Sequence, residues 1–169
     1  IILTNTTGSS LADNNASDNG NIGIILWSST NTTVRNNTVT GNGNIGILLT
    51  SSGSFPSPAF NNTLDANTVN GNGNFGIALR ESSTKNRIVG NTVRDNLNTG
   101  IELSEASTQN ELQRNFITGN RVSGMFVGSS AGNLIADNYF NNTKNFRNWT
   151  VSQNTRNTTK KSGPSIITS

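Results

Sequence analysis

Short apolar patches recur along the chain at a nearly constant interval. Each patch is a glycine followed by an apolar–x–apolar triplet, and the five glycines are Gly23, Gly46, Gly76, Gly100 and Gly124. The repeat measures about 24 residues, and one longer interval separates Gly46 from Gly76. Because each patch is short and alternates between apolar and variable residues, it predicts a β-strand rather than a helix.

Two kinds of column keep the same period. One column is apolar and contains Leu11, Val34, Leu64, Ile88, Leu112 and Ile135. Asparagine forms two more, one at Asn14, Asn37, Asn67, Asn91, Asn115 and Asn138, the other at Asn19, Asn42, Asn72, Asn96 and Asn120. Asparagine tolerates positive φ at turns, and its amide can bond to an identical amide stacked above it. We therefore interpret the asparagine columns as corners of a repeating structure.

The length of the repeat selects the fold. A unit of this length is too short for a four-stranded propeller blade, and the spacing of a leucine-rich repeat is absent. Three short strands and three turns fit one rung of a coil, in which each strand pairs with its copy about 4.8 Å away. The sequence thus predicts an all-β protein, a parallel β-helix of about seven rungs with three short strands in each.

The domain organisation follows from the same columns. We expect the β-helix to span residues 1–143, with a loop insertion at 53–60, and a degenerate last rung and tail over 144–169. Phe55 and Phe60 of the insertion could contact a partner or fold onto their own rung. Because the chain begins inside a rung, we expect either preceding chain or another subunit on that end.

The composition argues against metal binding, membrane insertion and nucleic acid binding. The chain contains no cysteine and no histidine, which are the usual ligands of transition metals, and only 12% of its residues are charged. No apolar run approaches the ~20 residues of a membrane helix, so we expect no membrane insertion. The basic residues are scattered and not interleaved with aromatic residues, so we expect no nucleic acid partner. No cofactor is expected.

Eight Asn-x-Ser/Thr sequons are present. Their asparagines are Asn5, Asn15, Asn31, Asn36, Asn61, Asn141, Asn148 and Asn157. Together with the low charge and the absence of cysteine, they favour an extracellular or cell-surface protein that carries glycans.

Two groups of residues are candidates for function. In the predicted stacking, Glu81 lies beside Glu105, and Glu102 points outward from the same strand region, next to Arg80. Glycoside hydrolysis uses paired carboxylates, although a solvated charge cluster is the simpler account, so no catalytic residue is assigned. The second group contains candidate interface residues on the outward side of the same strands or in the insertion. These are Ile25, Trp27, Leu48, Phe55, Phe60 and Phe126.

The repeat Asn-x-(Val/Ile)-x-x-Asn, followed by Gly-Ile-x-Leu-x-x-Ser-Ser-x-Asn, resembles the repeats of NosD-like proteins. The resemblance covers residues 11–143 and implies a right-handed β-helix of the carbohydrate-binding and sugar-hydrolase class. The ending from Asn157 resembles the closing segment of such repeats in large archaeal surface proteins. The namesake of the family is linked to copper delivery, but this chain offers only Met125 as a soft ligand, so no copper is expected.

These observations lead to an expectation about function. We expect a non-enzymatic, extracellular structural module that self-associates into an envelope layer, sheath or fibre, or that contacts neighbouring domains of a longer chain. The alternative is a carbohydrate-binding or polysaccharide-processing β-helix module with glycans as partners. A spacer domain in a large adhesin is a third hypothesis. The question of enzymatic activity stays open, with the lack of obvious chemistry against it.

Overall fold

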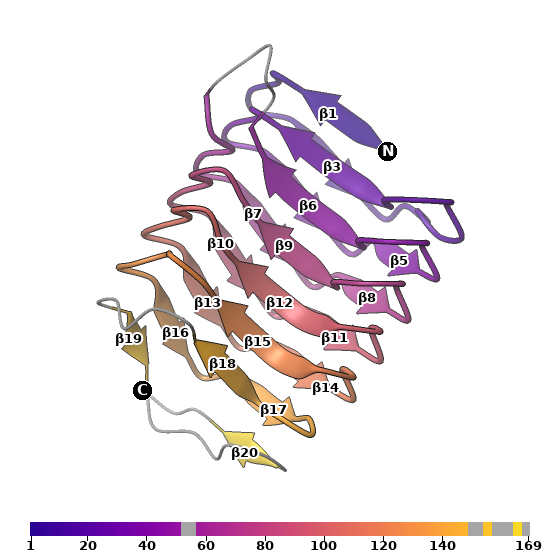
Figure 1. Ribbon diagram of the computed structural model, residues 1–169. Helices are drawn as coiled ribbons and strands as arrows, with labels where there is room; N and C mark the ends of the chain where they lie inside the picture. The colour runs from indigo at the N-terminus through magenta and orange to yellow at the C-terminus, as the bar shows by residue number, and fades with distance from the viewer. Residues whose placement is uncertain (52–56, 149–153, 157–163, 167–169) are drawn as a thin grey trace.

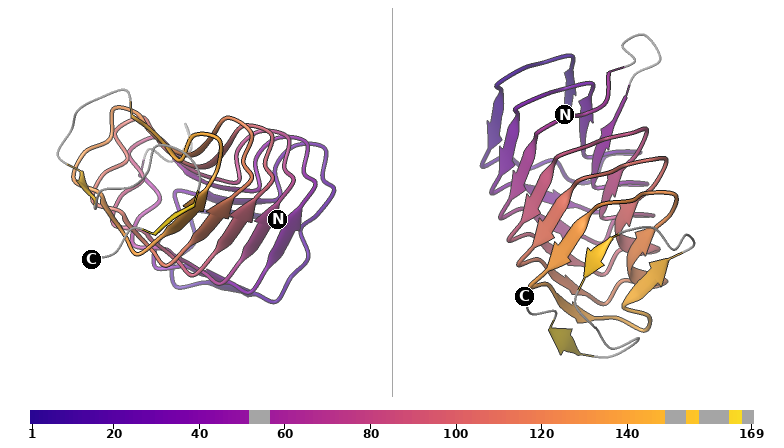
Figure 2. Two further views of the ribbon diagram at one scale, coloured as in Figure 1. Left: turned by 90° about the horizontal axis from the view of Figure 1, so that it is seen from below. Right: turned by 90° about the vertical axis from the view of Figure 1, so that its left-hand side faces the viewer.

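The protein is a coil of short β-strands (Figure 1). The computed structural model describes residues 1–51, 57–148, 154–156 and 164–166, and every helix or strand assigned within these ranges is a strand. The strands form three sheets that run the length of the coil, and successive rungs lie one above another in each view (Figure 2).

Each sheet takes one strand from each rung. The first sheet contains β1 (Ile2–Thr4), β3 (Ile24–Trp27), β6 (Ile47–Thr50), β9 (Ile77–Leu79), β12 (Thr99–Leu103), β15 (Ser123–Val127) and β18 (Phe146–Asn148). The second contains β2 (Ser10–Ala12), β4 (Thr33–Arg35), β7 (Thr63–Asp65), β10 (Arg87–Val89), β13 (Glu111–Gln113), β16 (Leu134–Ala136) and β19 (Thr155–Arg156). The third contains β5 (Thr38–Thr40), β8 (Thr68–Asn70), β11 (Thr92–Arg94), β14 (Phe116–Thr118), β17 (Tyr139–Asn141) and β20 (Ser165–Ile166).

The register of the strands confirms the predicted fold. Neighbouring strands pair in parallel with equivalent residues opposite one another, as Leu26 with Leu49 and Leu49 with Leu79. The pairing of β20 with β17 is antiparallel. With seven, seven and six strands in the sheets, the chain is a parallel β-helix of about six turns, close to the predicted seven.

Aliphatic side chains fill the inside of the coil. Ile47 and Leu49 of β6 point inward and are fully buried, and the same two positions are apolar in the neighbouring rungs. The glycine before each of these strands has little space around it. A Cβ at Gly100 would lie 2.6 Å from the carbonyl oxygen of Gly124 and 2.8 Å from Ile117 Cγ2, which explains the glycine column.

Asparagine side chains form three buried ladders at the corners. In each, the side-chain oxygen of one asparagine accepts hydrogen bonds from the backbone and side-chain amides of the asparagine one rung earlier, as Asn115 does from Asn91 at 3.0 Å. Two ladders are the predicted columns. The third was not predicted and contains Asn62, Asn86, Asn110, Asn133 and Asn154. The ladders satisfy polar groups that would otherwise be buried without partners.

Several sequence predictions remain open. The chain returns to register after the predicted insertion, since β7 pairs with β4, but the division at residue 143 stays a prediction. Phe55 lies outside the described residues. A partner on the first rung also stays a prediction. Within the described ranges no helix is long and apolar enough to cross a bilayer.

Candidate functional site

The outer face of the first sheet is covered on its N-terminal half by a small apolar cluster. Ile25 and Leu48 point outward, as predicted, but only 7% and 8% of their surfaces are exposed, and Ala78 is fully buried. The residues that pack against these three come mostly from the corners before the strands, and they are Ile22, Trp27, Ile45 and Phe75. These outward positions therefore form a covered apolar cluster rather than an open surface.

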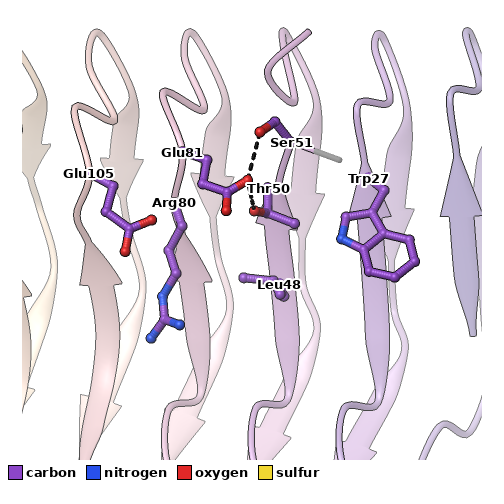
Figure 3. Close-up of a pocket in the computed structure, with 7 residues that line it drawn as sticks. All are labelled: Trp27, Leu48, Thr50, Ser51, Arg80, Glu81 and Glu105. Carbon is purple, nitrogen blue, oxygen red and sulfur yellow. Dashed lines mark hydrogen bonds between the residues drawn. The ribbon is translucent and has the colours of Figure 1, made fainter. Parts of the chain in front are cut away.

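A groove of about 370 Å³ shares Trp27 and Leu48 with this cluster (Figure 3). Its lining comes from four successive rungs and combines an aromatic ring, an aliphatic side chain, two hydroxyls and three charged groups. The lining residues are Trp27, Leu48, Thr50, Ser51, Arg80, Glu81 and Glu105. The structure thus brings Trp27 and Leu48, predicted as interface residues, together with two of the three candidate carboxylates.

Glu81 and Glu105 occupy equivalent corners on adjacent rungs. Both residues follow strands of the first sheet and have positive φ, 51° and 54°. The side-chain oxygen Oε2 of Glu81 accepts hydrogen bonds from Thr50 Oγ1 at 3.0 Å and from Ser51 Oγ at 2.6 Å. Figure 3 shows the Glu81 carboxylate reaching toward these hydroxyls and the Glu105 carboxylate leaning the same way. The two carboxylates consequently stand side by side along the groove.

Glu102 is the buried member of the three candidates. Its carboxylate oxygen Oε2 accepts hydrogen bonds from Arg80 Nε at 2.8 Å and Nη2 at 2.6 Å. Burial raises the pKa of Glu102 above its ordinary value, and the hydrogen bonds and positive charge of Arg80 oppose that rise. The guanidinium of Arg80 also lies 5.0 Å from the centre of the Phe75 ring. Glu102 therefore holds Arg80 in place and does not itself line the groove.

The remaining interface candidates lie elsewhere. Phe126 is outward on β15, and the guanidinium of Arg147 stacks over its ring at 4.7 Å. Phe60 lies beneath the ammonium group of Lys85, 5.4 Å from the ring centre. A role for either ring in binding a partner stays a prediction.

The sequon asparagines are more exposed than most ladder asparagines. All six in the described part of the chain whose side chains are placed are exposed, and these are Asn5, Asn15, Asn31, Asn36, Asn61 and Asn141. Asn61 donates a hydrogen bond to Asn31 at 2.6 Å. Of the other two, Asn148 closes β18 and Asn157 lies outside the described residues. Attachment of glycans stays a prediction.

Sequence reasoning missed two residues that line the groove and one that contacts Arg80. Thr50 and Ser51 stand one rung before Arg80 and Glu81. Applying the longer interval between Gly46 and Gly76 to these residues would have predicted that they lie beside each other. Phe75 was also missed, although its place directly before the repeated Gly76 marks it as a corner residue that can reach the outer face.

A coil of parallel strands stacked into three sheets defines a parallel β-helix protein, and this one has a groove on an outer face. The family model described as "Periplasmic copper-binding protein (NosD)" matches residues 1–57 and 54–169 of this chain. The chain belongs to this family, as its repeats suggested. A comparison with curated proteins finds no match.

The residues of this chain do not fit copper. Histidine and cysteine are absent, and the one methionine, Met125, is fully buried in the core of the coil. Across the described ranges, no group of three or more acidic residues is close enough together to hold a metal ion. Copper prefers imidazole and sulfur ligands, so this donor set offers it no site.

Solved structures similar to this chain share its fold. The A-module of a mannuronan C-5 epimerase from Azotobacter vinelandii matches 86% of this chain and 42% of its own, with a TM-score of 0.79 and 16% identity. A mutant of the periplasmic alginate epimerase AlgG matches 76% of this chain and 29% of its own, with a TM-score of 0.68 and 24% identity. The chain thus spans less than half the length of these structures.

The comparisons correct the expected function. The sequence favoured a non-enzymatic structural module that assembles into a layer, sheath or fibre. The similar structures are instead enzymes named for polysaccharide substrates, alginate and mannuronan. The main expectation is therefore wrong, and its alternative of a carbohydrate-binding or polysaccharide-processing module is favoured. The error arose because the chemistry of the outer face depends on residues brought together from four rungs.

Proposed function

We propose that this chain binds a polysaccharide in the groove over the first sheet and hydrolyses it there. One observation carries the proposal: a single groove combines the ring of Trp27 with two carboxylates on successive rungs, Glu81 and Glu105. Ligand sites are typically concave and largely apolar, with a few polar groups that fix orientation. This groove is more polar, since its apolar lining is limited to Trp27 and Leu48, and its open form and polar groups suit a chain of sugars.

The spacing of the two carboxylates supports glycoside hydrolysis with retention of configuration. Residues at equivalent positions on adjacent parallel strands stand about 4.8 Å apart. Retaining glycosidases place their two carboxyl groups about 5–5.5 Å apart, whereas inverting enzymes need a wider gap for a water molecule. The stacked corners of Glu81 and Glu105 therefore match the narrower arrangement.

The surroundings of the two residues suggest their roles. Hydrogen bonds from Thr50 and Ser51 fix the orientation of the Glu81 carboxylate, which suits a nucleophile that attacks the anomeric carbon and forms a glycosyl ester. Glu105 then donates a proton to the departing glycosidic oxygen. In the second half-reaction Glu105 takes a proton from water, which attacks the ester and releases the sugar and free Glu81.

Turnover and binding can be tested separately. We expect release of reducing ends from at least one polysaccharide in a panel of neutral and acidic glycans. Glu81→Gln and Glu105→Gln should each lower the rate at least 100-fold, because a nucleophile or a proton donor is lost. Glu111→Gln on β13 makes the same chemical change outside the groove and serves as the control. Binding without turnover would refute hydrolysis, and absence of binding to every glycan would refute the whole proposal.

Trp27 gives an optical signal for binding. The chain has two tryptophans, so Trp149→Phe leaves Trp27 alone to report on the groove. We expect a bound glycan to shift its fluorescence, and Trp27→Ala to weaken binding at least tenfold. The same affinities can be measured by calorimetry in the unmodified chain.

The proposal extends to location and modification. A polysaccharide-processing module meets its substrate in the periplasm or outside the cell, and the family description, which includes the word periplasmic, supports this setting. The exposure of six sequon asparagines supports glycan attachment on the same side of the membrane. Intact-mass measurement of protein isolated from its native source would show hexose-based mass increments, and their absence would refute the attachment of glycans.

A further inference from the structure

The charges around the groove restrict the kind of polysaccharide it can accept. Glu81 and Glu105 line the groove, and the buried Glu102 accepts hydrogen bonds from the lining residue Arg80. Arg80 is the one cation among the described residues that line the groove, and its two side-chain hydrogen bonds go to Glu102. Three carboxyl groups therefore face one guanidinium, and this group of residues carries a net negative charge whenever at least two of the three are ionised.

Several of the hydrogen-bond donors in the groove are already used inside the protein. Thr50 and Ser51 direct their hydroxyl protons to Glu81, and Arg80 directs Nε and Nη2 to Glu102. The groups left facing the groove are mainly carboxylate oxygens, which accept hydrogen bonds. A ligand that fits them supplies hydroxyl donors, whereas a ligand carboxylate would lie beside these carboxylates and would find as donors only the remaining N–H groups of Arg80 and the indole N–H of Trp27.

Cations elsewhere in the described residues do not change this balance. Lys85 lies over Phe60 and Arg147 over Phe126, and neither residue lines the groove. Arg87 pairs with Glu111 on the second sheet at 3.3 Å. The negative character of the groove is therefore a local property, although the whole chain has a formal net charge of +3.

We infer that the groove takes an uncharged glycan rich in free hydroxyl groups and rejects polyuronates. This inference rests on the proposed function and names its substrate class. It separates the chain from the similar structures, because alginate and mannuronan are polymers of uronic acids and carry a carboxylate on each sugar. Each ligand carboxylate that lies close to a carboxylate of the groove lowers the binding affinity by about tenfold or more.

Titration of Trp27 fluorescence in the Trp149→Phe background tests this substrate class. The probes are laminarin, dextran and soluble mannan as neutral glycans, alginate and polygalacturonate as polyuronates, and chitosan as a cationic polymer. We expect at least one neutral glycan to bind at least tenfold more tightly than either polyuronate. The double variant Glu81→Gln/Glu105→Gln should raise polyuronate affinity about tenfold and lower neutral-glycan affinity, while Glu111→Gln should change neither.

The outcomes separate this inference from the proposed function. Polyuronate binding as tight as that of the neutral glycans, or binding of chitosan alone, would overturn the substrate class and leave a polysaccharide site in place. No binding of any probe would overturn both. Thermal unfolding of each variant, followed by circular dichroism, verifies that a change in affinity comes from a folded protein.

Discussion

The two faces of the first sheet follow different rules. On the inner face the same kinds of side chain recur in each rung, as at Leu26, Leu49 and Leu79. On the outer face the equivalent positions change from Ile25 through Ala78 and Glu102 to Phe126 and Arg147. Because an inward residue must pack against both neighbouring rungs, stacking fixes it, whereas an outward residue is free to vary. Residues that carry function are therefore expected at the outward positions.

Breaking an asparagine ladder inside the coil should have the largest effect on the stability of the fold. Asn91 is buried and donates to Asn115, Leu64 and Val89, and it accepts from both amides of Asn67. Asn91→Ala removes the side-chain bond from each of these groups, at about 1–3 kcal/mol for each group that is left without a partner. We expect a loss of about 3–5 kcal/mol in the free energy of unfolding, measured by urea denaturation.

The exposed Asn21 is the matched control, since its side chain accepts one exposed hydrogen bond from Asn44. Asn21→Ala should cost less than about 0.5 kcal/mol. Equal losses for Asn21 and Asn91 would show that the ladders do not hold the coil together.

Truncating a side chain of the inner aliphatic column should have the second-largest effect on stability. Leu79→Ala removes a fully buried side chain from β9 and leaves a cavity, which should cost about 2–4 kcal/mol. The exposed Leu97, with 54% of its surface accessible, provides the control, and Leu97→Ala should change stability by less than about 0.5 kcal/mol. Differential scanning calorimetry of the pair would reveal the contrast, and similar melting temperatures would contradict it.

The Arg80–Glu102 pair should matter less than the core but more than an exposed pair. Arg80→Gln leaves a buried carboxylate without its partner, and we expect a loss of about 1–3 kcal/mol at pH 7. The matched change Arg87→Gln breaks an exposed pair with Glu111 and should cost less than about 0.5 kcal/mol. Denaturant titrations of both variants measure the difference. If the two losses were equal, the burial of Glu102 would have no energetic consequence.

The smallest expected effect is a dependence of stability on pH. Burial raises the pKa of Glu102 in the folded chain, so its contribution to stability is greatest below the ordinary value of 4.5 and falls as pH rises through the raised pKa. Glu102→Gln removes this titration. The melting temperature of the unmodified chain should therefore fall relative to that of the variant as pH increases above 4.5. Parallel curves over the whole range would contradict the predicted direction.

The sequence predicted the architecture well because the inner columns repeat. Glycine, aliphatic and two asparagine columns kept one period, and that period set the number of strands in each rung. The third ladder was missed because Thr32 holds its position in the second rung and the insertion shifts Asn62 away from the regular spacing. A search that allowed one longer rung would have found it, since Asn86, Asn110 and Asn133 follow at the regular interval.

The site was less predictable because it depends on contacts between rungs. Stacking arithmetic placed Glu81 beside Glu105, but it did not show that Thr50 and Ser51 hydrogen-bond to Glu81. The sequence also left open whether the outward apolar residues are covered, and corner residues such as Ile45 and Phe75 pack against them. The direction of a corner side chain depends on turn geometry, which the spacing of residues does not specify.

The longer rung also has a consequence for how such proteins can change. Leu49 and Leu79 remain opposite each other although the insertion lies between them, so the extra chain is accommodated without altering the stack. Loop length carries only a slowly growing entropic cost, so further additions at this corner are thermodynamically inexpensive. Ser51, where the longer segment departs, is itself a wall of the groove. Natural insertions or engineered ones can therefore place a new peptide beside the groove and change which ligand fits there, without changing the stacked strands.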